Sequence, residues 1–169
     1  MESISKFKDI TIRTELQSGD LGYVLYLHGI LYKRELDYGI EFENYVAKEL
    51  YEFYNQFNPK EDGVWIAEKD DKIIGLLFLM HRNNKTAQLR FFLILPEFRG
   101  IGLGKHLMQL FMDFLKEKKY TSAFLWTSDD VKTAVALYNK HGFELTEEIS
   151  SESFGKLVKE RRYDLKLVV

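Results

Sequence analysis

One stretch, residues 93–105, constrains this chain more than any other. A run of apolar residues stops at Pro96, and three glycines then alternate with aliphatic residues. Apolar side chains follow at helical spacing as far as Leu115, so the order predicts a strand, a glycine-rich turn and a helix. Such a turn aims backbone N–H groups and the positive end of a helix dipole at one point. We therefore expect an anionic ligand there, and a pyrophosphate suits this geometry.

The composition is that of an ordinary globular chain. Its 169 residues are enough for a single domain, 1–169, with a buried core, and 46% of them are hydrophobic. The net charge of −2 argues against direct nucleic-acid binding through a broadly basic surface. The absence of cysteine excludes a disulfide, a thiol nucleophile and a thiolate metal site.

Neither a signal peptide nor a membrane span is expected. The first residues are polar and mixed, unlike a signal peptide, and no apolar run is long enough to cross a bilayer. His81, His106 and His141 have no ligand-like spacing with Asp or Glu, so we expect no metal site. These features predict a cytoplasmic protein that does not contact membranes.

Hydrophobic periodicity and turn residues predict one strand, two helices, three strands, a helix, a strand, a helix and two closing strands, in that order. A break is expected in the first helix at Gly29, and Asp20 is expected to cap that helix. Asp129 or Asp130 is expected to cap the last helix, which Gly142 ends. The predicted strands are 10–16, 64–68, 72–80, 87–95, 122–127, 143–149 and 158–168, and the predicted helices are 21–36, 41–57, 103–118 and the short one ending at 142. This order predicts a mixed α/β (α+β) sheet with helices packed on it.

Two common phosphate-binding loops do not fit the glycine-rich turn. A Rossmann fingerprint would need a third glycine where Leu107 stands. A Walker A loop would need glycine in place of Arg99, and Ser or Thr in place of His106. The turn therefore belongs to another class of anion-binding loop.

The pattern Arg99-x-x-Gly102-x-Gly104 resembles the signature of the GCN5-related N-acetyltransferase (GNAT) superfamily. Pro96, three residues before the arginine, and the strand and helix on either side agree with that context. A second element, residues 134–143, resembles the family pattern Ala-x-x-Leu-Tyr-x-x-x-Gly-Phe. The family often has Asn three residues before that alanine, whereas this chain has Val131.

A narrower resemblance covers most of the chain and points to one bacterial group. Its members are the acetyltransferase halves of proteins that carry a MarR-type winged helix in front. The residues that carry this resemblance are His28-Gly29, Tyr32, Glu35, Phe42-Glu43, Trp65-Ile66-Ala67, Gln88-Leu89-Arg90, Leu125-Trp126-Thr127 and Ser153-Phe154-Gly155. The chain is too short to hold that winged helix, so we expect a free-standing catalytic half.

The resemblance implies a GNAT-like, largely antiparallel central sheet with helices on both faces. It also implies that acetyl-CoA is the co-substrate and that amides of the glycine-rich turn hold its pyrophosphate, supported by two cationic side chains. One N–H of the strand before the turn is expected to stabilise the oxyanion. The expected cofactor-binding residues are Leu93, Ile94, Leu95, Arg99, Gly100, Ile101, Gly102, Leu103, Gly104 and Lys105.

The resemblance makes Tyr138 the general acid that protonates the leaving CoA thiolate. Many relatives carry a carboxylate on the strand before the turn, but residues 87–95 contain no Asp or Glu. His28, Tyr32 and Glu35 would share one face of a continuous helix. Glu35 could attract a cationic amine and His28 could relay its proton, or water could take it. A merely solvated polar face is an equal alternative.

Together these features predict an N-acetyltransferase that acts by direct attack in a ternary complex. The acceptor is expected to be a primary amine, on a small molecule rather than on a protein or peptide. The alternative is a non-catalytic CoA-binding regulatory or sensor module. We leave open a homodimer, and the overall charge disfavours a direct DNA-binding function.

Overall fold

The computed structural model describes residues 8–168, which divide into two compact units. The first unit consists of the residues up to Leu16, Asn58–Ala123 and the residues from Leu167 onward. The second consists of Gln17–Phe57 and Phe124–Lys166. In the described part of the chain there are seven strands and four α-helices, and the strand pairs are mostly antiparallel. The predicted mixed α/β fold class is confirmed.

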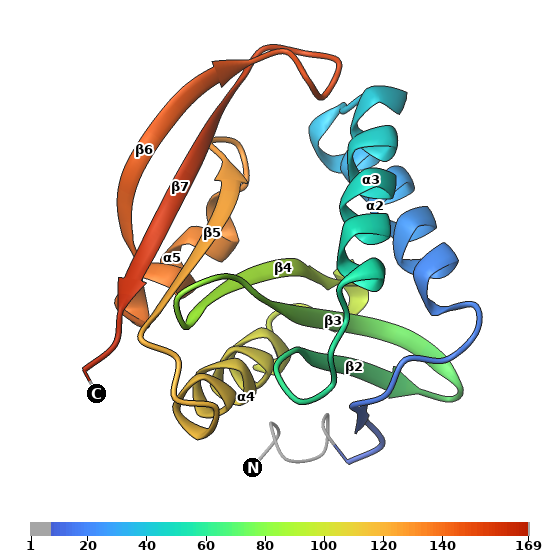
Figure 1. Ribbon diagram of the computed structural model, residues 1–169. Coiled ribbons are helices and arrows are strands. Elements are labelled where there is room, and N and C mark those ends of the chain that lie inside the picture. Colours follow the sequence, from blue (N-terminus) through green and yellow to red (C-terminus); the bar gives the residue numbers. More distant parts are fainter. Residues whose placement is uncertain (1–7, 169) are drawn as a thin grey trace. The chain divides into compact units, whose positions relative to one another are not determined.

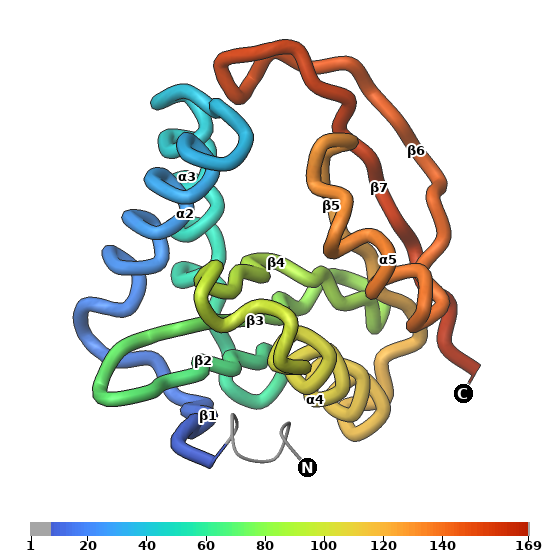
Figure 2. The backbone as a smooth tube through the Cα atoms, turned by 180° about the vertical axis from the view of Figure 1, so that it is seen from behind, coloured from blue at the N-terminus to red at the C-terminus, as the bar shows by residue number. Residues whose placement is uncertain are grey.

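The first unit is an antiparallel run of four strands with one helix on it (Figures 1 and 2). In order across the sheet, the strands are β1 (Thr11–Arg13), β2 (Gly63–Lys69), β3 (Lys72–His81) and β4 (Thr86–Ile94). The helix α4 (Leu103–Glu117) packs on β2, β3 and β4 through its apolar stripe. The buried stripe consists of Leu103, Leu107, Met108, Phe111 and Leu115. Its spacing is the helical periodicity on which the prediction rested.

The hairpin turns of this unit lie at polar residues between the predicted strands 64–68, 72–80 and 87–95. Asp70 and Asp71 connect β2 to β3, with φ angles of 50° and 59°. Asn84 and Lys85 connect β3 to β4, with φ angles of 58° and 55°. Two successive residues at positive φ are characteristic of the type I′ hairpin turn, which matches the strand twist. The opening strand was predicted at residues 10–16, but only Thr11–Arg13 pair with β2, so the observed strand is much shorter.

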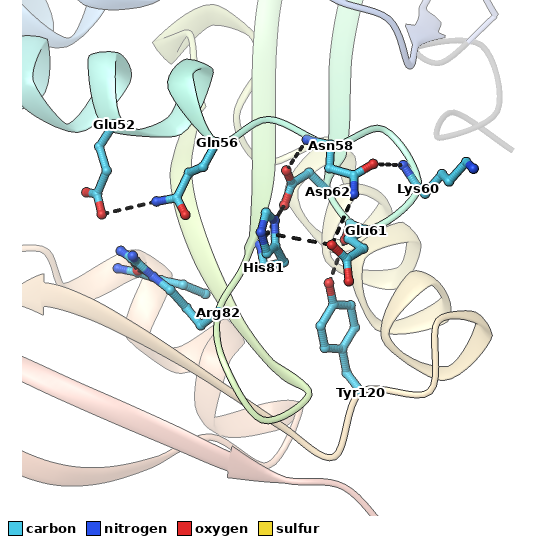
Figure 3. A network of polar contacts seen from close by, with 10 residues as sticks. Glu52, Gln56, Asn58, Lys60, Glu61, Asp62, His81, Arg82 and Tyr120 are labelled. Carbon is cyan, nitrogen blue, oxygen red and sulfur yellow. Dashed lines mark hydrogen bonds and ion pairs between the residues drawn. The ribbon is translucent and has the colours of Figure 1, made fainter.

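A buried carboxylate fixes the loop that leads into β2 (Figure 3). The Asp62 side chain is fully buried and accepts hydrogen bonds from the backbone N–H of His81, at 2.6 Å, and of Asn58, at 2.7 Å. The Nδ1 of His81 lies 2.7 Å from the Oδ1 of Asp62, the oxygen that also accepts from the His81 backbone N–H. The Tyr120 hydroxyl donates to the carbonyl oxygen of Glu61 at 2.6 Å. These bonds join the loop to the end of β3 and to the segment after α4.

The second unit contains the helical pair α2 (Asp20–Leu36) and α3 (Ile40–Asn55), which pack against each other (Figures 1 and 2). It also contains most of β5 (Ser122–Ser128), the helix α5 (Lys132–Lys140), and the long antiparallel pair β6 (Glu144–Ser151) and β7 (Val158–Lys166). Strand β7 lies between β5 and β6. Among residues 8–168, no helix combines the length and apolarity needed to cross a membrane.

The predicted break at Gly29 is wrong. Helix α2 runs without interruption from Asp20 to Leu36. A Cβ on Gly29 would lie 2.6 Å from the Oε1 of Glu43 on α3. Gly29 therefore allows a side chain of α3 to approach the backbone of α2 and does not bend the helix.

The predicted N-caps are also wrong. Gly19, at a φ of 95°, precedes α2, and the Asp20 carboxylate accepts a hydrogen bond from the backbone N–H of Gln17 instead. The residue that caps α5 is Val131, without a side-chain hydrogen bond. Asp129 accepts from the backbone N–H of Lys159. Asp20 and Asp129 each accept a hydrogen bond from a backbone N–H outside the helix that they were expected to cap.

Candidate functional site

The glycine-rich turn brings together the end of β4 and the start of α4 in the first unit. A short 3-10 turn, η1 (Pro96–Phe98), follows β4. Gly100 and Gly102 then take φ angles of 75° and 92°, a region that other residues seldom occupy. Gly102 is the residue before α4, and in the described chain no side chain caps that helix. The sequence prediction of strand, turn and helix is confirmed in this segment.

The uncapped start of α4 is a site of positive potential. The first turn contains Leu103, Gly104 and Lys105, and no acidic residue. Amides in the first turn of a helix have no partner within the helix. Lys105 is exposed and adds a positive charge where the helix dipole already disfavours one. An anion bound at this turn would satisfy the amides and offset both charges.

Arg99 holds the turn against the end of β4. Its Nε donates a 2.9 Å hydrogen bond to the carbonyl oxygen of Ile94. The guanidinium group is exposed, so the rest of it remains accessible to solvent. Gly75 on β3 lies opposite Ile94, and a Cβ there would lie 3.3 Å from the Leu103 side chain. The start of α4 is therefore packed directly on the sheet.

Of the three residues expected to offer backbone groups, only Ile94 has an N–H that points away from β3. The N–H of Leu95 donates to the carbonyl oxygen of Ile74 at 2.9 Å. Hydrogen-bonding direction alternates along an antiparallel strand, so Leu93 also faces β3 and Ile94 faces the other way. Within Leu93–Leu95, the N–H of Ile94 is therefore the one that fits the expected oxyanion donor. The other two contribute to the β3–β4 ladder.

A β-bulge precedes this point, and the sequence analysis missed it. Leu77 pairs with Phe92 and Leu79 pairs with Leu89, so β4 carries one residue more than β3 in this interval. The extra residue lies at Arg90–Phe91, opposite Phe78. A bulge redirects side chains and leaves one backbone position out of the ladder, and bulges are frequent beside active sites. In the sequence, Gln88 and Arg90 alternate with apolar residues, and an apolar run follows from Phe91, but this pattern was interpreted only as a strand.

Tyr138, the expected general acid, lies in the second unit on α5. Its side chain is buried, and its ring lies 6.1 Å from that of Phe143. Burial raises the pKa of the phenol well above its usual value, and the nearby hydroxyl of Tyr32 raises it further. Tyr138 therefore stays protonated throughout the physiological pH range, as a proton donor must.

His28 is buried in α2, which disfavours its role as a base. Its Nδ1 lies 2.7 Å from the carbonyl oxygen of Val24, and a carbonyl only accepts, so Nδ1 carries the proton. Burial lowers the pKa of His28 to about 4, although the bond to Val24 works in the opposite direction. The side chain is therefore neutral near pH 7 and has little tendency to take up a second proton.

The predicted polar stripe of α2 forms on one face but changes along its length. Because the helix is continuous, His28, Tyr32 and Glu35 share a face. His28 is buried and stacks on Tyr32 at 5.7 Å, Tyr32 is half-buried, and Glu35 is exposed. Tyr32 lies 4.6 Å from the ring of Phe42 and 5.7 Å from that of Tyr38. Along this face of α2, the side chains change from buried at His28 to exposed at Glu35.

A polar network that the sequence did not indicate lies around Tyr38. The Tyr38 hydroxyl lies 2.5 Å from the Ser128 hydroxyl and donates to the Asp130 carboxylate at 2.6 Å. Ser128 donates to the same carboxylate oxygen at 2.7 Å. The Lys156 ammonium lies 3.1 Å from the other oxygen and 5.3 Å from the centre of the Tyr38 ring. This network joins the α2–α3 turn to the segments that follow β5 and β6.

The sequence was compared with known families and proteins. The acetyltransferase (GNAT) family profile matches residues 30–143. The chain is similar to probable N-acetyltransferase 14 of Xenopus tropicalis, with 28% identity over 102 residues, which is 59% of this chain. The match spans only half the length of that relative.

Solved structures agree in fold. An acetyltransferase from Streptococcus agalactiae superposes with a TM-score of 0.73 and 23% identity, covering 95% of this chain and 100% of that one. The PaiA N-acetyltransferase of Thermoplasma acidophilum, in complex with coenzyme A, gives a TM-score of 0.68 and 18% identity, covering 94% and 99%. The narrower resemblance to MarR-type fusion proteins stays a prediction. The chain belongs to the acetyltransferase (GNAT) family, which confirms the family expected from Arg99, Gly102 and Gly104.

Proposed function

We propose that this protein transfers an acetyl group from acetyl-CoA to a primary amine, on a small molecule rather than on a protein. The uncapped start of α4 after Gly100 and Gly102 carries the proposal, because it presents amides and positive charge to an anion. The family match and the CoA complex of the Thermoplasma acidophilum neighbour support CoA as that ligand.

The turn would bind the CoA pyrophosphate through the amides of residues 100–105. Lys105 would add a charge-assisted contact, and Arg99 would hold the turn in place through its bond to Ile94. The N–H of Ile94 would support the thioester oxygen as it becomes an oxyanion. These groups all lie in the first unit, so this unit would bind the acetyl donor.

The reaction would proceed by direct attack. The acceptor ammonium first loses a proton to a base or to water, and the neutral nitrogen then attacks the acetyl carbonyl carbon. A C–N bond forms, the C–S bond breaks, and the CoA thiolate takes a proton that we assign to Tyr138. The attacking nitrogen gives up its second proton to solvent, and Tyr138 regains a proton from solvent. The chain has no cysteine, so an acetyl-cysteine intermediate is excluded and both substrates must be bound together.

One observation favours a second function, a CoA-binding sensor without turnover. Strand β4 carries no Asp or Glu, and the low pKa of His28 makes it a poor base. A protein that binds CoA and has no means of deprotonating an amine would respond to CoA without consuming it. Both functions use the same CoA-binding turn, and they differ only in whether an acetyl group is transferred.

Thiol release from acetyl-CoA separates the two functions. Because the chain contains no cysteine, a thiol-reactive dye would detect only CoA, without a protein background. We expect release to depend on an added primary amine, and mass spectrometry should find the amine heavier by one acetyl group. Tight CoA binding with no release on a broad panel of amines would favour the sensor. Failure to bind CoA at all would contradict both.

A further inference from the structure

Helix α2 carries a glycine at the point where a carboxylate of α3 approaches it most closely. A Cβ on Gly29 would lie 2.6 Å from the Oε1 of Glu43, and 3.4 Å from its Cδ. Real Cβ atoms do not come this close to another atom, so any other residue would displace the carboxylate, which is the movable end of a flexible side chain. Glycine inside a helix costs roughly 1 kcal/mol relative to alanine. At position 29, the glycine leaves room for the Glu43 carboxylate to lie against the α2 backbone.

Among the described residues, no hydrogen-bond or ion-pair partner explains the position of the Glu43 carboxylate. Its side chain is half-buried, and within residues 8–168 it makes no hydrogen bond or ion pair. A half-buried carboxylate without a protein partner keeps only part of its hydration, which is unfavourable. A cationic ligand would supply the missing partner, and the half-buried position leaves it accessible.

The surroundings of Glu43 fit an amine that carries an apolar or aromatic group. Phe42 precedes it on α3, and the Phe42 ring lies 4.6 Å from that of the half-buried Tyr32. Tyr32 is one turn from Gly29 on α2 and close enough to Tyr138 to raise its pKa. The carboxylate therefore lies in the same part of the second unit as the proposed acid.

A simpler role for Glu43 is to stabilise α3, since acidic residues in the first turn favour a helix. Glu41 occupies the same turn and would serve that role equally well. The two side chains differ in burial, because Glu41 is exposed. Glu41, whose carboxylate approaches Gly39 and Gly155 and not the α2 backbone, is thus the control for effects on helix stability.

We propose that Glu43 binds the protonated amino group of the acceptor and so determines its selection as a cationic primary amine. This inference rests on the proposed function and adds an acceptor-binding carboxylate to it. Gly29 is then a positioning residue, which leaves room for the carboxylate. Glu35 and His28 are not needed for amine recognition.

The test compares two ligands that differ only in charge. Tyramine carries an ammonium group, and tyrosol carries a hydroxyl group in its place on the same ring and chain. Binding of each is measured by ligand-observed NMR titration to the CoA-loaded protein. We expect the wild type to prefer tyramine at least tenfold, the size of one charge-assisted hydrogen bond. Glu43→Gln should abolish that preference, and Glu41→Gln should retain it.

Gly29→Ala provides an independent variant. The new Cβ must displace the Glu43 carboxylate, so the preference for tyramine should fall several-fold while tyrosol binding changes little. Gly22→Ala is its matched control on the same helix, because a Cβ there meets nothing within 4 Å. Circular dichroism confirms that each variant is folded.

Two results would overturn the assignment: a wild type that binds both ligands equally, or a Glu43→Gln protein that still prefers tyramine. A parallel CoA titration keeps this outcome separate from failure of the proposed function. If CoA binds normally and tyramine is not preferred, only the role of Glu43 is wrong. If CoA does not bind, the proposed function itself fails.

Discussion

The Nε of Arg99 lies 2.9 Å from the carbonyl oxygen of Ile94, and this hydrogen bond closes the glycine-rich turn onto the end of β4. Arg99 thus has a structural contact in addition to its charge. Replacing it by alanine removes both, so we expect CoA affinity to fall by about tenfold. Calorimetric titration of CoA measures the change. Lys60→Ala removes one positive charge from an exposed loop of the same unit, and it should leave the affinity unchanged.

Burial of His28 makes the stability of the protein depend on pH. Its pKa is about 4 in the folded chain against 6.5 when exposed, so the unfolded state binds more protons below pH 6.5. The contribution of buried, neutral His28 to the free energy of unfolding is complete above pH 6.5 and is lost as the pH falls toward 4. Between pH 7 and pH 5 the free energy of unfolding should drop by about 2 kcal/mol. Urea denaturation at the two pH values measures it, and the drop should shrink in His28→Gln. An equal drop in both proteins would contradict this account.

Tyr138→Phe tests the proton donor. Loss of a general acid lowers kcat by about a hundredfold, while the affinity for CoA should not change. Because burial raises the pKa of Tyr138, the wild-type rate should show no decline from phenol ionisation up to about pH 10. Steady-state rates from pH 6 to pH 10 check both points. Full turnover by the phenylalanine variant would remove Tyr138 from the mechanism.

The network around Tyr38 should contribute measurably to stability. Tyr38→Phe removes the hydroxyl that contacts Ser128 and Asp130, and it leaves a half-buried carboxylate with one donor fewer. We expect the free energy of unfolding to fall by about 1–3 kcal/mol. Tyr51, which is 75% exposed, provides the control, since Tyr51→Phe should change it by less than about 0.5 kcal/mol. Equal stability of the two variants would show that the network contributes nothing.

Periodicity and turn residues were sufficient to predict the helices and most of the strands. The hairpin turns were predictable because Asp70, Asp71 and Asn84 tolerate positive φ. The glycine-rich turn was predictable because few backbones place glycines in that pattern between a strand and a helix. Local sequence therefore determined most of the elements and the donor-binding turn.

Features that depend on distant partners could not be predicted. Gly29 was interpreted as a helix break because its partner, Glu43, is on another helix. Asp130 was interpreted as a cap because nothing local indicates Tyr38, which is 92 residues away in sequence. The β4 bulge lies at Arg90–Phe91, where polar and apolar alternation gives way to an apolar run that does not define the register with β3. Gly29 and Glu43 are both among the residues of the narrower resemblance, and that was the available signal for their contact.

Titration with CoA and with pantetheine tests the central claim most directly. Pantetheine carries the thiol arm of CoA and lacks its pyrophosphate. If the turn from Arg99 to Lys105 binds that pyrophosphate, CoA should bind at least a hundredfold more tightly than pantetheine, as expected for several charge-assisted hydrogen bonds. Equal affinity for the two ligands, or no binding of CoA, would contradict the account.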